Sequence, residues 1–231
     1  MKKITLLLLI FVLTFTFSCD SEDDTPETTY KLVKLEGFNS DDELEFSSTI
    51  EYNEDGFLNK AIETIGNETY ITNYIYSNGK IVTVDYPDSD ETENYTYTDD
   101  LITSSVTEEG SQTYNYTYMY NSSNQMIKKT KTTQGNAVSE TTYTYDINDN
   151  ALSVNYGNSN VITYTYDTKI NPLRLALPNA LLKIFSIGQN NKLISNPDVN
   201  YTYEYNDNDY PTKQNYYLNG DLEQYNLYTY E

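Results

Sequence analysis

The feature that most constrains this chain is a recurring Tyr-x-Tyr segment followed by a run of Asn, Asp, Ser or Gly. The last Tyr of each segment stands at eight positions: Tyr52, Tyr76, Tyr97, Tyr120, Tyr145, Tyr166, Tyr205 and Tyr230. Successive positions are 24, 21, 23, 25, 21, 39 and 25 residues apart. One unit of near-constant length therefore repeats along the chain, and one copy carries an insertion.

Within a unit the side chains alternate with a period of two. Tyr116, Tyr118 and Tyr120 share one face of an extended strand, while Thr117 and Met119 take the other face. The Asn, Asp and Gly residues between the segments tolerate the positive φ that tight hairpins need. Each unit is therefore predicted to be a strand, a tight turn and a returning strand.

Seven such units predict an all-β, antiparallel meander of about fourteen strands in Tyr-rich hairpin repeats. The pattern leaves open whether the strands form a large curved sheet or a closed barrel. A membrane-spanning barrel is disfavoured, because the faces opposite the Tyr rows carry Thr, Asn and Lys instead of apolar residues. The core is expected to be built from Tyr, since one buried ring removes about 150 to 250 Å² from water.

The insertion in the sixth unit is the least β-like part of the chain. Pro178 suits a first helical turn, Gly188 follows an apolar run, and one short helix is predicted near 178–187. We expect this segment to cover one end of the sheet or its edge. The alternative is a lid over a ligand cleft.

The N-terminus has the order of a secretory signal. Lys2 and Lys3 precede an apolar stretch over residues 4–17, which is shorter than the roughly 20 residues of a membrane helix. Cys19 is the only cysteine, and cleavage after Ser18 would leave it as the first residue. This arrangement resembles a bacterial lipobox, which implies a signal peptide over 1–18, a lipid on Cys19, and a membrane as a partner through that lipid anchor.

Residues 19–30 are predicted to form an acidic tether with no apolar periodicity. The acidic run after Cys19 resembles the surface-export signal of lipoproteins in some Gram-negative lineages. In other lineages an Asp directly after the lipidated Cys resembles an inner-membrane retention mark. We expect a surface-exposed lipoprotein of the outer membrane, with a periplasm-facing lipoprotein as the alternative, and a single β repeat domain over 31–231.

Residues 143–146 and 164–167 both read Tyr-Thr-Tyr-Asp, and residues 52–58 end in Gly-Phe-Leu. These segments resemble the Tyr-Asp (YD, or RHS-like) repeat family and, more narrowly, small uncharacterised bacterial surface lipoproteins that carry such repeats. The resemblance covers roughly residues 48 to 231 and implies a β fold and an exported location, without an established activity. Arg is common in the repeats of large toxin shells, and Arg174 is the only Arg here, so a toxin-encapsulating role is not expected.

Composition excludes several classes of function. The chain has no His and one Cys, which removes imidazole bases, His-dependent nucleophiles and the usual zinc sites. A net charge of −21 argues against nucleic acid as a partner, because binding to phosphates depends on Lys and Arg. We expect no cofactor and no metal, and we assign no catalytic residue.

Two acidic patterns carry only weak signals. Asp146, Asn148 and Asn150 have the alternating spacing of a calcium loop but lack its Gly and distal Glu, so turn chemistry is favoured. The acidic clusters within 41–45 and 88–93 are interpreted as solvated surface. Paired carboxylates could serve a glycosidase, but 35 Asp and Glu residues without distinguishing context give no assignment.

The sequence thus predicts an exported, lipid-anchored cell-envelope protein that is a non-enzymatic binding or interaction module, with a glycan or protein as its ligand. A carboxylate-dependent hydrolase acting on glycans and a structural envelope component are the alternatives. Tyr rows on a concave, exposed face would favour binding, because the ring stacks while the hydroxyl forms hydrogen bonds. The sequence does not determine which rows point outward.

Overall fold

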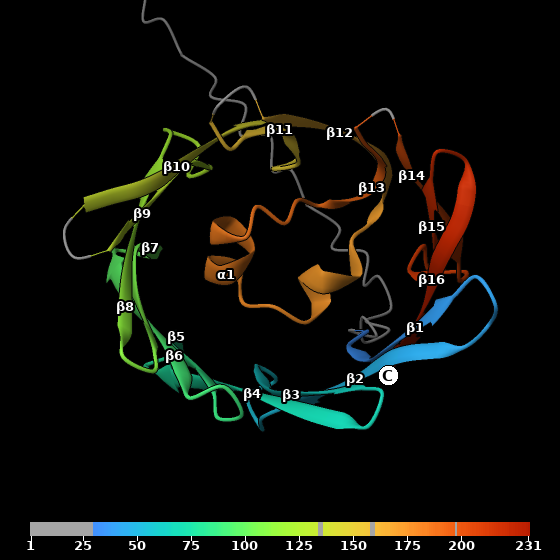
Figure 1. Cartoon of the computed structure of the whole chain (residues 1–231), viewed down its shortest axis with the longest axis horizontal. Coiled ribbons are helices and arrows are strands. Elements are labelled where there is room, and N and C mark those ends of the chain that lie inside the picture. Colours follow the sequence, from blue (N-terminus) through green and yellow to red (C-terminus); the bar gives the residue numbers. More distant parts are fainter. Residues whose placement is uncertain (1–29, 134–135, 158–159, 197) are drawn as a thin grey trace, which may run out of the picture.

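A computed structural model describes residues 30–133, 136–157, 160–196 and 198–231. Sixteen antiparallel strands form a closed barrel in which each strand pairs with its neighbours in sequence (Figure 1). The ring closes where β1 (Leu32–Asn39) pairs with β16 (Asp221–Tyr230). Within the described part of the chain, no helix has the length and apolar character needed to cross a membrane.

The other strands follow one another around the ring. They are β2 (Leu44–Tyr52), β3 (Leu58–Ile65), β4 (Glu68–Ser77), β5 (Lys80–Tyr86), β6 (Glu91–Thr98), β7 (Leu101–Glu109), β8 (Gln112–Tyr120), β9 (Met126–Thr133), β10 (Asn136–Tyr145), β11 (Ala151–Asn155), β12 (Val161–Ile170), β13 (Asn190–Ser195), β14 (Val199–Tyr205) and β15 (Pro211–Leu218). Between β12 and β13 lie a 3-10 helix, η1 (Pro172–Leu175), and a short α-helix, α1 (Asn179–Ile184).

The predicted all-β antiparallel meander is confirmed. Its strands form a closed barrel and not an open curved sheet. The strand number exceeds the expected fourteen by two. Each of the eight Tyr segments contributes to an even-numbered strand, which makes eight two-stranded units. The opening strand of the first unit, β1, lies before the part of the sequence in which the repeat is recognisable.

The face of each even-numbered strand that carries the last Tyr of its segment points into the barrel, and the opposite face points out. On β8, Tyr118 is 5% exposed, whereas its neighbour Met119 is 57% exposed. Outward positions on this strand also carry the exposed residues Asn115 and Thr117. The outer face of β8 is therefore mostly polar, as expected for a surface in contact with water.

The last Tyr of most units forms the same hydrogen bond. Its hydroxyl donates to a backbone carbonyl at the start of the strand that comes directly before it in the chain, at distances of 2.6 to 2.8 Å. The pairs are Tyr52–Leu32, Tyr97–Ile81, Tyr120–Ile102, Tyr145–Met126, Tyr166–Ala151 and Tyr230–Pro211. A buried phenol needs such a partner, and the repeated bond ties the end of an even-numbered strand to the start of the strand before it.

In several units the turn at this end of the barrel is closed by an Asn or Asp that directly follows the last Tyr. Asn121 Oδ1 accepts the backbone N–H of Ser123 and of Gln125, and Asn206 Oδ1 accepts those of Asn208 and Tyr210. This Asx-turn geometry explains why Tyr is followed by Asn or Asp in these units. In the described chain, every non-Gly residue with positive φ except Ser186 is Asn or Asp.

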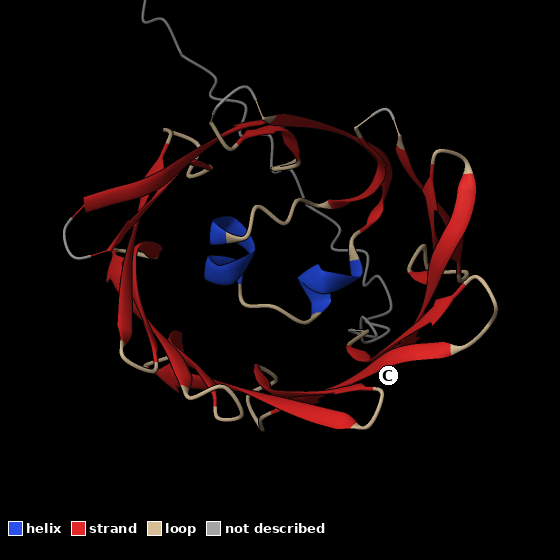
Figure 2. Ribbon diagram, viewed as in Figure 1, coloured by secondary structure: helices blue, strands red, loops and turns tan. Residues whose placement is uncertain are grey.

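The insertion lies inside the barrel. Figure 2 shows both helices within the ring of strands. Leu181 and Ile184 of α1 are 0% and 2% exposed and pack into a cluster with Ile81, Ile102 and Tyr118 of the wall. The helix expected near 178–187 is present but shorter, at Asn179–Ile184, and the segment covers one end of the barrel from within.

Candidate functional site

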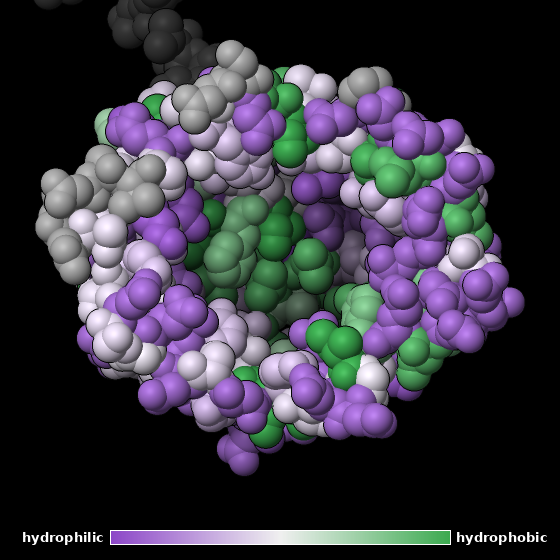
Figure 3. All heavy atoms as spheres, in the orientation of Figure 1, coloured by the Kyte–Doolittle hydropathy of each residue, from purple (hydrophilic) through white to green (hydrophobic). Residues whose placement is uncertain are grey.

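The candidate site is the lumen of the barrel above this insertion. We call residues 171–189, which include η1 and α1, the plug. Figure 3 shows the molecule hollowed along the barrel axis, with apolar residues at the bottom of the hollow and a largely hydrophilic rim. A concave site that combines apolar surface with a few polar groups is the usual form of a ligand-binding site.

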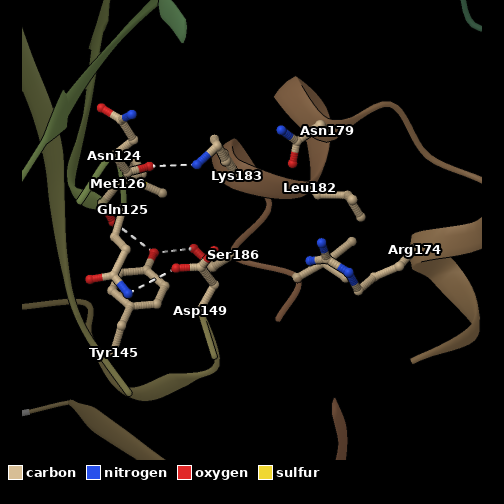
Figure 4. A pocket seen from close by; sticks show the side chains of 11 residues that line it. Asn124, Gln125, Met126, Tyr145, Asp149, Arg174, Asn179, Leu182, Lys183 and Ser186 are labelled. Carbon is tan, nitrogen blue, oxygen red and sulfur yellow. Dashed lines mark hydrogen bonds between the residues drawn. The ribbon is translucent and has the colours of Figure 1, made fainter. Parts of the chain in front are cut away.

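The plug is fastened to the turns beside it by polar contacts (Figure 4). Lys183 Nζ donates to the carbonyl of Asn124 at 2.8 Å, and the hydroxyls of Tyr145 and Ser186 are 2.9 Å apart. Gln125 Nε2 stabilises the neighbouring turn by donating to Asp149 Oδ1 at 2.9 Å. These bonds hold the floor of the lumen in one position.

A close backbone contact completes the attachment. Near the end of the plug lies Gly188, where a Cβ atom would be 2.3 Å from Asn150 Oδ1 and 2.6 Å from Asn150 Cα. Asn150 in turn accepts the N–H of Asn190 at 2.9 Å, so that the plug leads directly into β13. Only glycine fits this approach without displacing backbone.

Between the plug and the wall formed by β12–β16 and β1 lies a cavity of about 360 Å³. Its polar lining includes Lys192, Tyr203, Gln214, Asn226 and Tyr228. Its apolar lining comes from the wall and from the plug, and includes Leu35, Leu173, Phe185 and Ile187. This volume matches the lower part of the range of about 300 to 1,000 Å³ that is typical of small-molecule sites.

The polar groups of this cavity are held in a connected network. Gln214 Oε1 accepts hydrogen bonds from Asn226 Nδ2 at 2.9 Å and from the Tyr228 hydroxyl at 3.3 Å. Gln214 Nε2 donates to the Tyr203 hydroxyl at 2.7 Å, which donates to the carbonyl of Lys192 at 2.9 Å. Burial raises the pKa of both Tyr203 and Tyr228, so both phenols stay protonated at neutral pH.

Lys192 faces the lumen from β13, opposite Tyr166 in the strand register. Its Nζ lies 4.5 Å from the centroid of the Tyr164 ring, within the range of a cation–π interaction. The residue is exposed to the lumen, yet the surrounding wall desolvates its ammonium group and lowers its pKa. No hydrogen bond or ion pair joins Nζ to another described residue.

The opposite wall carries carboxylates and a second group of lysines. Glu93 on β6 accepts hydrogen bonds from Ser105 at 2.7 Å and from Tyr95 at 3.0 Å. Lys129 and Lys131 on β9 lie 4.6 Å from the Tyr116 ring centroid and 3.7 Å from the Tyr114 ring centroid, respectively. This wall therefore balances positive and negative charge within one patch.

Glu91 lies on this wall close to two other carboxylates. Desolvation raises the pKa of Glu91, and the charges of Glu109 and Glu93 raise it further, while Lys131 opposes the shift. Glu91 and Glu109 are direct partners in the β6–β7 register. The acidic cluster within 88–93 is therefore divided, because Asp88 and Asp90 lie exposed in the turn while Glu91 and Glu93 line the lumen.

Three other features predicted from the sequence are the N-terminal anchor, the turn with calcium-like spacing and the absence of a metal site. Cys19, the signal peptide over 1–18 and nearly all of the tether over 19–30 lie outside the described residues. Asp146 Oδ1 accepts the N–H groups of Asn148 and Asn150 at 2.8 and 2.9 Å, so the calcium-like spacing serves a turn. Within the described ranges, no group of three or more His, Cys, Asp or Glu residues is arranged to hold a metal ion.

Sequence reasoning missed the lumenal lysines and amides. Lys129 and Lys131 alternate along one strand, which indicates a shared face. The register needed to place that face beside the Tyr rows is not readable from one segment, because a one-residue shift exchanges the two faces. Gln214, Asn226 and Lys192 come from three strands between β13 and β16, and the inward faces of these strands bring them to one cavity.

No protein-family model matches the chain, and no curated protein matches it in sequence. Among solved structures, it is similar to a porin-like protein from Bacteroides uniformis ATCC 8492, with a TM-score of 0.57 and 16% identity over 87% of this chain and 96% of that chain. This likeness concerns the barrel fold alone.

Two larger assemblies also align, each with a TM-score of 0.32 and over 9% of its own chain. They are the Photorhabdus luminescens Tc holotoxin pore, at 14% identity over 80% of this chain, and the TcdB2-TccC3-TEV structure, at 17% identity over 83% of this chain.

Proposed function

We propose that this protein is an exported, lipid-anchored cell-envelope protein that binds oligosaccharides in the open, Tyr-lined mouth of its barrel. The observation that supports this most is the combination of a solvent-open lumen, inward Tyr rows and a fixed apolar floor. Sugar rings present apolar faces and many hydroxyls. Tyr offers a flat ring for the faces and a phenol for the hydroxyls, and amides such as Gln214 and Asn226 add directional hydrogen bonds.

The geometry favours binding over conduction. The plug packs across one end of the lumen through Leu181 and Ile184, and a channel would need that end open. A lipid-facing barrel also needs an apolar outer band about 25 Å tall, whereas Asn115 and Thr117 stand on the outer face of β8. We infer a barrel held beside a membrane, and the porin-like name of the similar structure agrees with an envelope location.

Binding is also favoured over glycan hydrolysis. A glycosidase places two carboxylates on either side of the scissile bond. Glu91, Glu93 and Glu109 lie together on the neighbouring strands β6 and β7 of one wall. They are suited to neutralise Lys129 and Lys131 and to accept hydrogen bonds from sugar hydroxyls.

The proposed anchor fits the position of β1. The Tyr52 hydroxyl donates to the carbonyl of Leu32, so β1 begins at the same end of the barrel as the Tyr–carbonyl bonds and the plug. A lipid on Cys19 would therefore hold the plugged end toward the membrane and leave the mouth facing away. Cys19→Ser should release the protein from the membrane fraction, and labelled fatty acid remaining on that variant would contradict the assignment.

The binding proposal is tested with two Tyr residues at the mouth. Tyr70 and Tyr156 are 41% and 48% exposed, so replacing either with Ala leaves the core intact. With a bound oligosaccharide identified on a glycan array, each variant should bind about two- to tenfold more weakly in titration calorimetry, which is the effect of losing one aromatic contact.

Tyr225→Ala is the matched control, because Tyr225 faces outward and stacks on Phe38 at a centroid distance of 5.0 Å. Its affinity should equal that of the unmodified protein. Equal loss in all three variants, or no oligosaccharide bound by the unmodified protein, would overturn the proposal.

A further inference from the structure

The lysines of the lumen differ in how their charge is balanced. Glu93 raises the pKa of Lys129 against the larger effect of desolvation, and Lys131 lowers the pKa of Glu91, so these two lysines share a wall with carboxylates. Lys192 stands on the other wall, where its lowered pKa reflects desolvation alone. Its ammonium group is the one positive charge that borders the 360 Å³ cavity from the wall strands.

Asp167 follows Tyr166, the register partner of Lys192, and its carboxylate already accepts hydrogen bonds from other residues. Asp167 Oδ1 accepts the backbone N–H groups of Lys169 and Asn191, at 2.9 and 3.0 Å. Its Oδ2 accepts the Asn191 side chain at 3.0 Å and the Tyr205 hydroxyl. Asp167 thus holds the irregular end of β12 against β13 and leaves the Lys192 donors to the cavity.

The surroundings of Lys192 suit a sugar that carries a negative charge. Its three N–H donors are not used by any described residue, and the ring of Tyr164 supports the ammonium group from one side. Tyr203, Gln214 and Asn226 beside it are fixed by hydrogen bonds to one another. Their polar groups can also form hydrogen bonds with the hydroxyl groups of a sugar. A desolvated ammonium group gains strongly from an anionic partner.

We propose that the cavity beside Lys192 is a subsite for an acidic sugar unit, whose carboxylate or sulfate group binds the Lys192 ammonium while its ring packs against Tyr203 and Tyr228. This inference rests on the proposed oligosaccharide binding and adds the chemical class of the ligand. The net charge of −21 does not prevent it, because salt at physiological strength screens charges beyond about 8 Å.

The test compares ligands that differ only in charge. Short oligomers of galacturonic, glucuronic and mannuronic acid are titrated into the mature chain beside their methyl esters, which keep the sugar skeleton and lose the charge. Sulfated neutral oligomers form a third arm that separates sulfate from carboxylate. At least one anionic oligomer should bind about tenfold more tightly than its neutral counterpart, the effect of one charged hydrogen bond.

Substitution of the lysine should remove this preference alone. Lys192→Met should bind the anionic oligomer as weakly as its neutral form, with the neutral affinity unchanged, whereas Lys192→Arg should keep the preference. Lys213→Met is the matched control. Its Nζ also lies over a Tyr ring, 4.4 Å from the Tyr225 centroid, but on the outer face of the barrel.

The possible failures are distinguishable. Equal binding of charged and neutral oligomers by the unmodified protein, or a preference that survives in Lys192→Met, would overturn the acidic subsite and leave oligosaccharide binding standing. Binding of none of the charged, esterified or sulfated oligomers would overturn the acidic subsite, and the absence of any bound oligosaccharide on the glycan array as well would overturn both.

Discussion

At the scale of single residues, Tyr combines two roles that other barrels divide between different side chains. Its ring fills the interior, and its hydroxyl supplies a hydrogen bond to a neighbouring strand, as between Tyr120 and Ile102 at 2.6 Å. Tyr76 is the exception, since its buried hydroxyl has no partner among the described residues. The chain therefore contains both a bonded and an unbonded version of the same position.

This difference predicts that replacing Tyr by Phe changes the free energy of unfolding differently at the two positions. Tyr145→Phe removes the hydroxyl that serves the Met126 carbonyl and Ser186, and should lower the free energy of unfolding by about 1 kcal/mol in urea titrations. Tyr76→Phe removes an unpartnered hydroxyl and should leave stability unchanged or raise it. An equal loss in both variants would show that the hydroxyl bond does not contribute.

Alkaline pH should unfold the barrel as its phenols ionise. Burial raises the pKa of five lumenal Tyr residues from 10.0 to about 12: Tyr52, Tyr97, Tyr120, Tyr145 and Tyr164. Their contribution is complete below pH 10, the pKa in the unfolded chain, and is lost as pH rises toward 12.

We expect the phenolate absorbance of these residues to appear together with loss of circular dichroism above about pH 11. In denaturing urea the same absorbance should appear near pH 10, the ordinary range of Tyr. Full ionisation near pH 10 without urea, with the fold retained, would contradict the inward placement of the Tyr rows.

At the scale of elements, the plug is the part that the sequence described least completely. Pro178, Gly188 and the apolar run indicated a short helix, and α1 is present at Asn179–Ile184. Its position in the lumen followed from contacts with Ile81 and Ile102, which come from strands about 80 to 100 residues earlier. Such long-range packing leaves no local pattern, so an outer cover and an inner plug look alike in sequence.

Gly188→Ala should loosen the plug, because its methyl group would meet the Asn150 backbone and side chain. Overpacking of this kind costs about 1 to 3 kcal/mol. We expect a lower free energy of unfolding in urea and faster cleavage by trypsin at Arg174 and Lys183, both within the plug.

The control for this substitution is Gly66→Ala, at a turn where an added Cβ meets nothing within 4 Å. It carries only the strain of a positive φ, which costs about 1 to 2 kcal/mol. Trypsin cleavage in the plug should be unchanged in this control, and accelerated cleavage in both variants would contradict a specific docking contact.

At the scale of the whole molecule, closure of the barrel depends on one pairing between distant strands. Period-two alternation and turn residues such as Asn78 and Gly79 predicted strands and hairpins along the chain. They could not distinguish a curved sheet from a ring, because that choice depends on β1 meeting β16. The same closure assembles the Lys192 cavity from strands on both sides of the seam, so the site was equally hidden.

The seam permits a test of closure. Lys31 and Glu231 exchange backbone hydrogen bonds of 2.9 and 3.0 Å. A circular permutant that joins these residues by a short linker and opens the chain at the turn between β3 and β4 should keep the fold and the circular dichroism of the parent. A permutant opened inside α1 should instead lose plug stability, and failure of the first permutant to fold would count against a closed ring.

The β1–β16 seam also sets the order in which strands can pair during synthesis. A chain that emerges N-terminus first presents β1 long before β16 arrives, so one row of its backbone N–H and C=O groups has no strand to bind. Such an unfinished edge attracts strands of other molecules. We therefore expect a chain that lacks β16 to associate with other chains more readily than the closed barrel does.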